Sequence, residues 1–322
     1  MAALTINEIR LAAKRIRPYA KRTPVLTCAS LDKQVGTHVF LKCENLQKAG
    51  AFKFRGACNA VFSLDKRALE RGVVTHSSGN HAQALSLAAR LRGIEAYIVM
   101  PSSAPQVKKA AVEDYGGKIT FCEPTLAARE STQALVIAKT GATMVHPYNN
   151  YQVIAGQGTA ALELLEDVPD LEVILVPVGG GGLLSGTAIA ASEISPGIRV
   201  IGAEPERADD AFRSMEAGRI IPSVNPQTIA DGLVTSLGDL TFPIIKERVD
   251  QIVTVSEEGI VAAMRFVWER AKIIVEPSAA VALGAMWEHK IKLAGLRVGV
   301  ILSGGNVDLD RLPWQSHSNS RQ

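Results

Sequence analysis

Residues 50–57, "GAFKFRGA", place a lysine where a charge is difficult to keep. Lys53 lies between Phe52 and Phe54, in a stretch otherwise made of glycine, alanine and one arginine. Burying an ammonium group costs several kcal/mol unless a partner compensates. Either the lysine stem packs past the two rings and the ammonium stays in water, or the amine is kept neutral to act as a nucleophile. Taken alone, the octapeptide favours the first interpretation.

Four consecutive glycines form the strongest ligand motif. Gly179, Gly180, Gly181 and Gly182 follow the apolar stretch "VILVPV" and precede the helical pattern "LLSGTAIAA". A flexible linker is the alternative, but linkers are not usually placed between a buried strand and an apolar helix. Backbone N–H groups at such a turn, together with the helix N-terminus, bind anions. The motif predicts a phosphate-binding loop. It lacks the G-x-x-x-x-G-K-[ST] pattern of nucleoside triphosphatases.

A second strand-to-helix turn lies at residues 75–84, "THSSGNHAQA". Serine and asparagine at a helix start commonly cap it, and an uncapped helix start also binds a carboxylate. Ser77, Ser78 and Asn80 are therefore candidates for ligand binding, with the Asn80 amide directed to a ring oxygen. His81 follows, either as a base or as a structural residue.

Ser303 ends a third apolar stretch, "GVILSGGN". Ligands of open α/β sheets bind beyond the carboxyl ends of the strands, where a serine hydroxyl can reach a ring nitrogen, although a turn serine is the plainer explanation. A phosphate loop, a partner for a ring nitrogen and a partly buried lysine together describe a pyridoxal phosphate site. Lys53 would form a Schiff base with the aldehyde, which requires an amine pKa below its ordinary value of about 10.4. The cofactor would act as the electron sink.

The stretch "GQGTAA", residues 156–161, matches the dinucleotide pattern G-x-G-x-x-A. However, the preceding "HPYNNYQVIA" is too polar and broken for a strand, and no acid follows at about 20 residues to bind a ribose. A nicotinamide dehydrogenase is therefore disfavoured.

Short β-branched apolar stretches alternate with helical patterns along the chain. This alternation predicts an α/β fold with mostly parallel sheets whose faces are covered by helices. Helices are expected at 81–93 and 153–167. The expected strands begin near residues 38, 72, 96, 117, 173, 199 and 297.

Composition narrows the class of protein. The chain has 322 residues, 47% hydrophobic, which is enough for two domains. A net charge of +3 without a basic, aromatic-rich patch argues against nucleic-acid binding. No apolar stretch reaches the roughly 20 residues that span a bilayer, and no secretory signal is apparent. The four cysteines are widely spaced, so a reducing, cytoplasmic location is expected.

In family order, the chain carries "ENLQKAGAFKFRGA", "SSGNHAQA", "GQGTAALELL", "GGGGLLSG", "AEPERADDA", "TIADGL", "VEPSAA" and "LSGGNVD". It resembles the fold-type II pyridoxal phosphate enzymes of the serine/threonine dehydratase family, and within it the serine racemases. The resemblance implies a tryptophan synthase beta-like fold, with a large cofactor-binding domain at 1–71 and 152–322 and a small domain at 72–151.

The resemblance also assigns roles to the candidate residues. It makes Lys53 the Schiff-base lysine, packs Phe52 on the cofactor ring and directs Asn80 to the ring hydroxyl. Gly179, Gly180, Gly181 and Gly182 would hold the phosphate, and Ser303 would face the pyridine nitrogen. A serine there leaves that nitrogen largely unprotonated, which favours elimination over transamination.

The "SSGN" motif narrows the implied reaction, because dehydratases of this family commonly read "SAGN" and serine racemases "SSGN". Racemisation needs proton-transfer groups on both faces of the Cα carbanion, which Lys53 and Ser78 could supply. The expected activity interconverts L- and D-serine and eliminates water from serine or threonine, giving a 2-oxo acid and ammonia. The substrate carboxylate would lie near Ser77, Asn80 and His81. The alternative is a threo-3-hydroxyaspartate ammonia-lyase giving oxaloacetate, with Arg129 binding the extra carboxylate.

"AEPERADDA" is similar to the divalent-cation site of the family. Glu204 and Asp210 would supply carboxylates and Ala208 a backbone carbonyl, a set suited to Mg²⁺, Ca²⁺ or Mn²⁺. Alternatively, Asp209 and Asp210 only stabilise a helix start.

Effector binding is less well matched. Lys48, Arg270 and Asn306 match positions of the nucleotide-effector site of the family. Cys28, Ala29 and Ala49 depart from it, which argues against ATP binding. A homodimer is expected by resemblance. A non-catalytic protein on the same scaffold would be expected to have lost the lysine or the glycines, and both are present.

Overall fold

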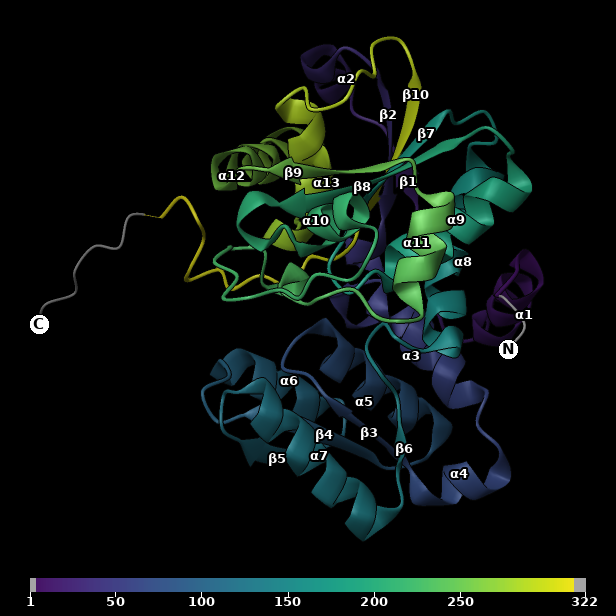
Figure 1. Cartoon of the computed structure of the whole chain (residues 1–322), viewed down its shortest axis with the longest axis vertical. Coiled ribbons are helices and arrows are strands. Elements are labelled where there is room, and N and C mark those ends of the chain that lie inside the picture. Colours follow the sequence, from purple (N-terminus) through teal and green to yellow (C-terminus); the bar gives the residue numbers. More distant parts are fainter. Residues whose placement is uncertain (1–3, 316–322) are drawn as a thin grey trace, which may run out of the picture.

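The computed structural model describes residues 4–315 and contains two sheets, each surrounded by helices (Figure 1). The strands are β1 Val25–Leu26, β2 His38–Cys43, β3 Val73–His76, β4 Ala96–Pro101, β5 Gly117–Cys122, β6 Thr143–Met144, β7 Val173–Pro177, β8 Arg199–Pro205, β9 Gln251–Val255 and β10 Arg297–Leu302. The larger sheet has the order β1-β2-β10-β7-β8-β9 and the smaller one β5-β4-β3-β6. All neighbouring strands are parallel except β1 and β2.

Thirteen α-helices connect and cover these strands within residues 4–315. They are α1 Ile6–Ile16, α2 Ala29–Val35, α3 Lys53–Phe62, α4 Lys66–Arg71, α5 Asn80–Arg92, α6 Gln106–Asp114, α7 Leu126–Thr140, α8 Tyr151–Asp167, α9 Gly182–Ile194, α10 Asp210–Ala217, α11 Thr241–Arg248, α12 Glu257–Phe266 and α13 Pro277–Trp287. Short 3-10 turns include η1 Glu44–Leu46 and η2 Lys48–Gly50. None of the described helices has an apolar stretch of the length that a bilayer crossing requires.

The predicted α/β class is confirmed, and all seven expected strands are present. The sequence did not reveal β1, β6 and β9. Two of them have two residues each, which is too short for a pattern to show. The third, β9, is the edge strand "QIVTV", and its exposed and partly buried positions break the apolar run that marked the other strands.

The larger sheet is covered on both faces. One apolar cluster packs α2, α12 and α13 against it, and a second packs α1, α8, α9 and α11 against it. The stretch "GQGTAA" lies inside α8, so it forms no dinucleotide loop. Its glycines permit close helix packing instead. A Cβ on Gly156 would lie 2.6 Å from the Cα of Gly56 in α3, and one on Gly158 would lie 2.8 Å from the carbonyl oxygen of Gly186 in α9.

Helix α3 packs toward both sheets. Its Phe54, Ala57, Cys58 and Val61 join the apolar core of the smaller sheet, with residues of β3, β4 and α5. The strands of that sheet fall between residues 73 and 144. The division into domains at residues 72 and 151 stays a prediction.

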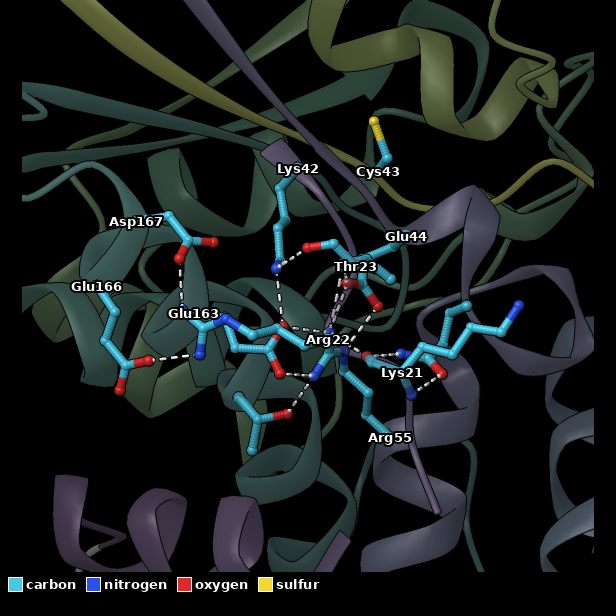
Figure 2. Close-up of polar contacts among 12 residues, drawn as sticks. Lys21, Arg22, Thr23, Lys42, Cys43, Glu44, Arg55, Glu163, Glu166 and Asp167 are labelled. Carbon is cyan, nitrogen blue, oxygen red and sulfur yellow. Dashed lines mark hydrogen bonds and ion pairs between the residues drawn. The ribbon is translucent and has the colours of Figure 1, made fainter. Parts of the chain in front are cut away.

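A largely buried ionic cluster fixes the start of α3 (Figure 2). The guanidinium of Arg55 donates to both carboxylate oxygens of Glu44 at 2.7 and 2.8 Å, and to both of Glu163 in α8 at 2.8 and 2.7 Å. The ammonium of Lys42 in β2 also donates to Glu163, at 2.7 Å. Because Arg55 follows Lys53 by two residues, this cluster sets the position from which the Lys53 side chain leaves the helix.

Candidate active site

Lys53 is the first residue of α3, at the junction of the two sheets. It is partly buried, and its Nζ donates a hydrogen bond of 2.9 Å to the carbonyl oxygen of Pro147. Nζ also lies 5.1 Å from the ring centroid of Phe52. Burial lowers the pKa of Lys53 to about 8, against an opposing effect of Glu276. A neutral amine is therefore accessible near physiological pH, as nucleophilic chemistry requires.

Ser303 lies beside this lysine although 250 residues separate them in the sequence. The Phe52 amide donates to the Ser303 carbonyl oxygen at 2.9 Å, and an isolated bridge pairs Ala51 with Gly304. Ser303 directly follows the central strand β10 and is buried. The structure thus places the predicted ring-nitrogen partner next to the predicted Schiff-base lysine.

The four glycines follow β7 and open α9, as the sequence predicts. Gly181 is the N-cap residue, with a φ of 84° that favours glycine, and no side chain caps the helix. A Cβ on Gly180 would lie 2.2 Å from a ring carbon of Tyr148. Gly180 and Gly181 therefore cannot be replaced by larger residues without strain, and the N–H groups at the start of α9 have no side-chain cap. Free N–H groups at a helix start suit the binding of a phosphate group.

Ser77 and Ser78 lie between the end of β3 and the start of α5. The N-cap residue of α5 is Gly79, without a side-chain cap, and Gly79 N–H donates to the Ser77 hydroxyl at 3.3 Å. The cap explanation therefore does not account for Ser78, which is partly exposed. The uncapped helix start remains suited to a carboxylate.

Asn80 belongs to a chain of polar contacts that the sequence did not reveal. Its amide Nδ2 donates to Glu276 at 2.8 Å, and its Oδ1 accepts from Asn306 at 2.9 Å. Burial raises the pKa of Glu276 to about 8, so this carboxyl holds a proton at neutral pH. One feature of the sequence could have pointed to Glu276: it is an acid in the apolar stretch "IIVEPSAAVAL", where a charge is costly to bury.

His81 is a buried, neutral residue of the site. His81 is buried, and its Nε2 donates to the Val145 carbonyl oxygen at 3.0 Å. Burial lowers its pKa to about 3, with a further effect of the Lys53 charge, so the ring is neutral.

Arg129 in α7 is partly buried, and its Nε has no partner among the described residues. Helix α7 packs against β3. Burial lowers the pKa of His76 at the end of β3; the Glu130 charge opposes this shift and the Arg129 charge adds to it.

Glu204 and Asp210 meet at the end of β8, and both are fully buried. Glu204 accepts from the amides of Ala211 and Phe212 at 3.1 and 3.0 Å, whereas neither carboxylate oxygen of Asp210 has a hydrogen-bond partner within residues 4–315. Burial and the nearby Asp210 raise the pKa of Glu204 to about 9. No group of three or more His, Cys, Asp or Glu side chains in residues 4–315 could hold a metal. These two carboxylates with the Ala208 carbonyl fit the donor chemistry of a hard cation.

The chain is similar to known proteins over nearly its whole length. The family model described as pyridoxal-phosphate dependent enzyme matches residues 16–304. The chain is 52% identical to beta-hydroxyaspartate dehydratase of Paracoccus denitrificans over 96% of this chain and 98% of the relative. It is also 52% identical to serine racemase of Dictyostelium discoideum, over 97% and 98%. The crystal structure of the Dictyostelium enzyme covers 96% of this chain and 100% of its own, with a TM-score of 0.92. The chain therefore belongs to the pyridoxal-phosphate dependent enzymes.

Proposed function

We propose that the protein is a serine racemase that also eliminates water from serine or threonine. Two observations carry this proposal: the pKa of Lys53 is lowered to about 8, and Ser78 is a partly exposed serine that does not cap α5. Relatives from Dictyostelium discoideum and Arabidopsis thaliana, 52% and 51% identical, are serine racemases. The homodimer and the cytoplasmic location stay predictions.

The chain offers a residue for each task of this reaction. The N–H groups of the glycine turn would hold the cofactor phosphate, and the Ser303 hydroxyl would be the partner of the ring nitrogen. The start of α5 orients the substrate carboxylate. Lys53 Nζ takes the α-proton on one face of the substrate, and the Ser78 hydroxyl delivers a proton on the other. Pyridoxal phosphate, when bound, supplies the electron sink for the substrate carbanion.

The specific prediction for Ser78 separates the two activities. Ser78→Ala should lower L-to-D conversion of serine by about 100-fold or more, the usual loss on removing a positioned proton donor. Pyruvate formation should fall less than tenfold, because elimination uses the face of Lys53. Both products are measured in one assay, D-serine by chiral chromatography and pyruvate by coupled reduction. Ser131→Ala, at an exposed serine in α7, is the matched control and should leave both activities unchanged. Equal losses of racemisation and elimination in Ser78→Ala would contradict the role of Ser78.

A second candidate function is hydroxyaspartate ammonia-lyase. It is favoured by the unpartnered Nε of Arg129 in α7, the helix that packs against β3, and by the Paracoccus relative. We expect L-serine to yield D-serine and pyruvate with the purified holoenzyme. Turnover of L-threo-3-hydroxyaspartate without any of serine would establish the second function instead. In that case Arg129→Gln should raise KM for hydroxyaspartate at least tenfold, the cost of losing one charged hydrogen bond.

We also propose that Glu204, Asp210 and the Ala208 carbonyl bind Mg²⁺ or a similar cation. A cation that binds the folded state at 100 times its Kd stabilises it by about 2.7 kcal/mol. Millimolar Mg²⁺ or Ca²⁺ should therefore raise Tm by several degrees, and a chelator should reverse the shift. Asp210→Asn should abolish the shift, whereas Glu216→Gln, an exposed carboxylate on the same helix, should keep it. A shift that survives Asp210→Asn would place the cation elsewhere.

A further inference from the structure

Residues 145–150, which we call the connector, join β6 to α8 and contact several parts of the site. The Val145 carbonyl oxygen accepts from His81, and the Pro147 carbonyl oxygen accepts from Lys53. The Tyr148 ring lies against Gly180, because a Cβ there would meet three of its ring carbons at 2.2–2.4 Å. Asn150 caps α8 through the amides of Gln152 and Val153. The connector thus touches both the lysine and the glycine turn.

His146 gives the connector its shape. Its Nδ1 accepts the backbone N–H of Asn149 at 2.9 Å and that of Tyr148 at 3.3 Å. A ring nitrogen that accepts two N–H groups carries no proton. Burial lowers the pKa of His146 to about 4, with further effects of His76 and Lys53 and an opposing effect of Asp239. The imidazole is therefore neutral near pH 7, where its Nδ1 can accept both hydrogen bonds of the turn.

This turn determines where the Pro147 carbonyl points. Pro147 lies between His146 and the two residues, Tyr148 and Asn149, whose amides donate to the His146 ring. The peptide group that carries the Pro147 carbonyl therefore cannot rotate without breaking those hydrogen bonds. The ring of His146 also packs edge-on against Tyr148, with centroids 4.5 Å apart, and against His76 at 6.4 Å. The carbonyl oxygen is thereby held 2.9 Å from Lys53 Nζ.

We propose that His146 is a positioning residue for Lys53. Through the turn at residues 146–149 it holds the Pro147 carbonyl as the acceptor for the lysine amine whenever that amine is not bonded to the cofactor. The proposal rests on the function proposed for Lys53, since only a reacting lysine benefits from a fixed resting place. Neither the sequence motifs nor the assigned site residues include His146.

His146→Asn and His146→Gln have similar size and polarity, and comparing them separates a role of His146 in positioning Lys53 from a role in packing alone. His146→Asn places its side-chain oxygen near the position of Nδ1 and keeps the acceptor, because asparagine closes the same kind of turn. His146→Gln carries its amide one bond further, near the position of Nε2, and loses that acceptor. His146→Ala removes both nitrogens.

The first measurement is the pKa of Lys53 in the cofactor-free protein. It is obtained from the pH dependence of acylation of Lys53, quantified by mass spectrometry, and needs no catalysis. A carbonyl stabilises an ammonium donor more than a neutral amine, so loss of the Pro147 contact should lower this pKa by about 0.7 unit in His146→Gln and His146→Ala. His146→Asn should retain the wild-type value. An unchanged or raised pKa in His146→Gln, or a shift in His146→Asn as large as in His146→Gln, would overturn the proposal.

The second measurement is steady-state kinetics of the holoenzyme on L-serine. His146→Gln should lower kcat about tenfold or more, since a displaced base transfers protons poorly, while KM changes less than twofold. His146→Asn should recover most of kcat. A rise in KM at unchanged kcat would also overturn the proposal. If Lys53 were not the reacting lysine, the pKa of Lys53 would still shift but kcat would not, so the two failures are distinguishable.

Discussion

Lys53→Ala is expected to lower the formation of both D-serine and pyruvate by about 10⁴-fold or more. The substitution removes the nucleophile that holds the cofactor and the base that takes the α-proton, and each of these contributions is large by itself. The purified variant should also lack the visible absorbance band of a lysine-linked cofactor. Spectra and coupled assays at matched protein concentration measure both effects.

The control for this prediction is Lys66, which, like Lys53, is the first residue of a helix but is exposed to solvent. Lys66→Ala removes an exposed lysine at the start of α4 and should leave both activities and the spectrum unchanged. The assignment of Lys53 is contradicted if Lys53→Ala retains the absorbance band after dialysis against free cofactor. Weak activity without the band would be consistent with the role assigned to this residue.

Arg55→Met is expected to cost about 3–5 kcal/mol of unfolding free energy, because it breaks a buried ion pair and leaves a partner unpaired. Glu44 is fully buried, and two of its hydrogen bonds come from Arg55 (Figure 2). Arg55→Lys should lose less, although a lysine cannot form the paired contacts of a guanidinium with two carboxylates. Urea unfolding followed by circular dichroism measures the difference.

The chain contains a matched control for this second prediction. Arg22 forms ion pairs with Glu166 and Asp167 at 2.7 and 2.5 Å, but half of its side chain is exposed. Arg22→Met should therefore change the unfolding free energy by no more than about 1 kcal/mol. If the two variants were equally stable, burial would not be what makes the Arg55 cluster important.

The strands and the ligand motifs were predictable from the sequence because their signals are local. A buried parallel strand is a continuous apolar stretch, and β7 with its four glycines shows both the strand and the turn that follows it. The carboxyl ends of neighbouring parallel strands meet at one edge of their sheet, so Gly179 and Ser303, which follow β7 and β10 of the larger sheet, could be expected near one another. Ser77 follows β3 of the smaller sheet, so this argument does not reach it. Ser77 and Ser303 directly follow β3 and β10, and Gly179 lies two residues after the end of β7.

The surroundings of Lys53 were predictable only in part. Phe52 does lie near the amine, but Phe54 points into the core of the smaller sheet and is fully buried there. Burial is the main cause of the lowered pKa of Lys53. The carbonyl that accepts from its amine belongs to Pro147, and the charge that opposes the shift belongs to Glu276, 94 and 223 residues further along the chain. No pattern around residue 53 carries information about them.

The sequence by itself determined the α/β fold, the strand ends at which ligands bind and the residue types available there, since all of these follow from local pattern and spacing. Tertiary structure alone decided which amine is desolvated, which carboxyl stays protonated and which carbonyl accepts from Lys53. Those properties depend on distances of a few ångströms between segments far apart in the chain, and electrostatic energies change steeply over such distances once water is excluded.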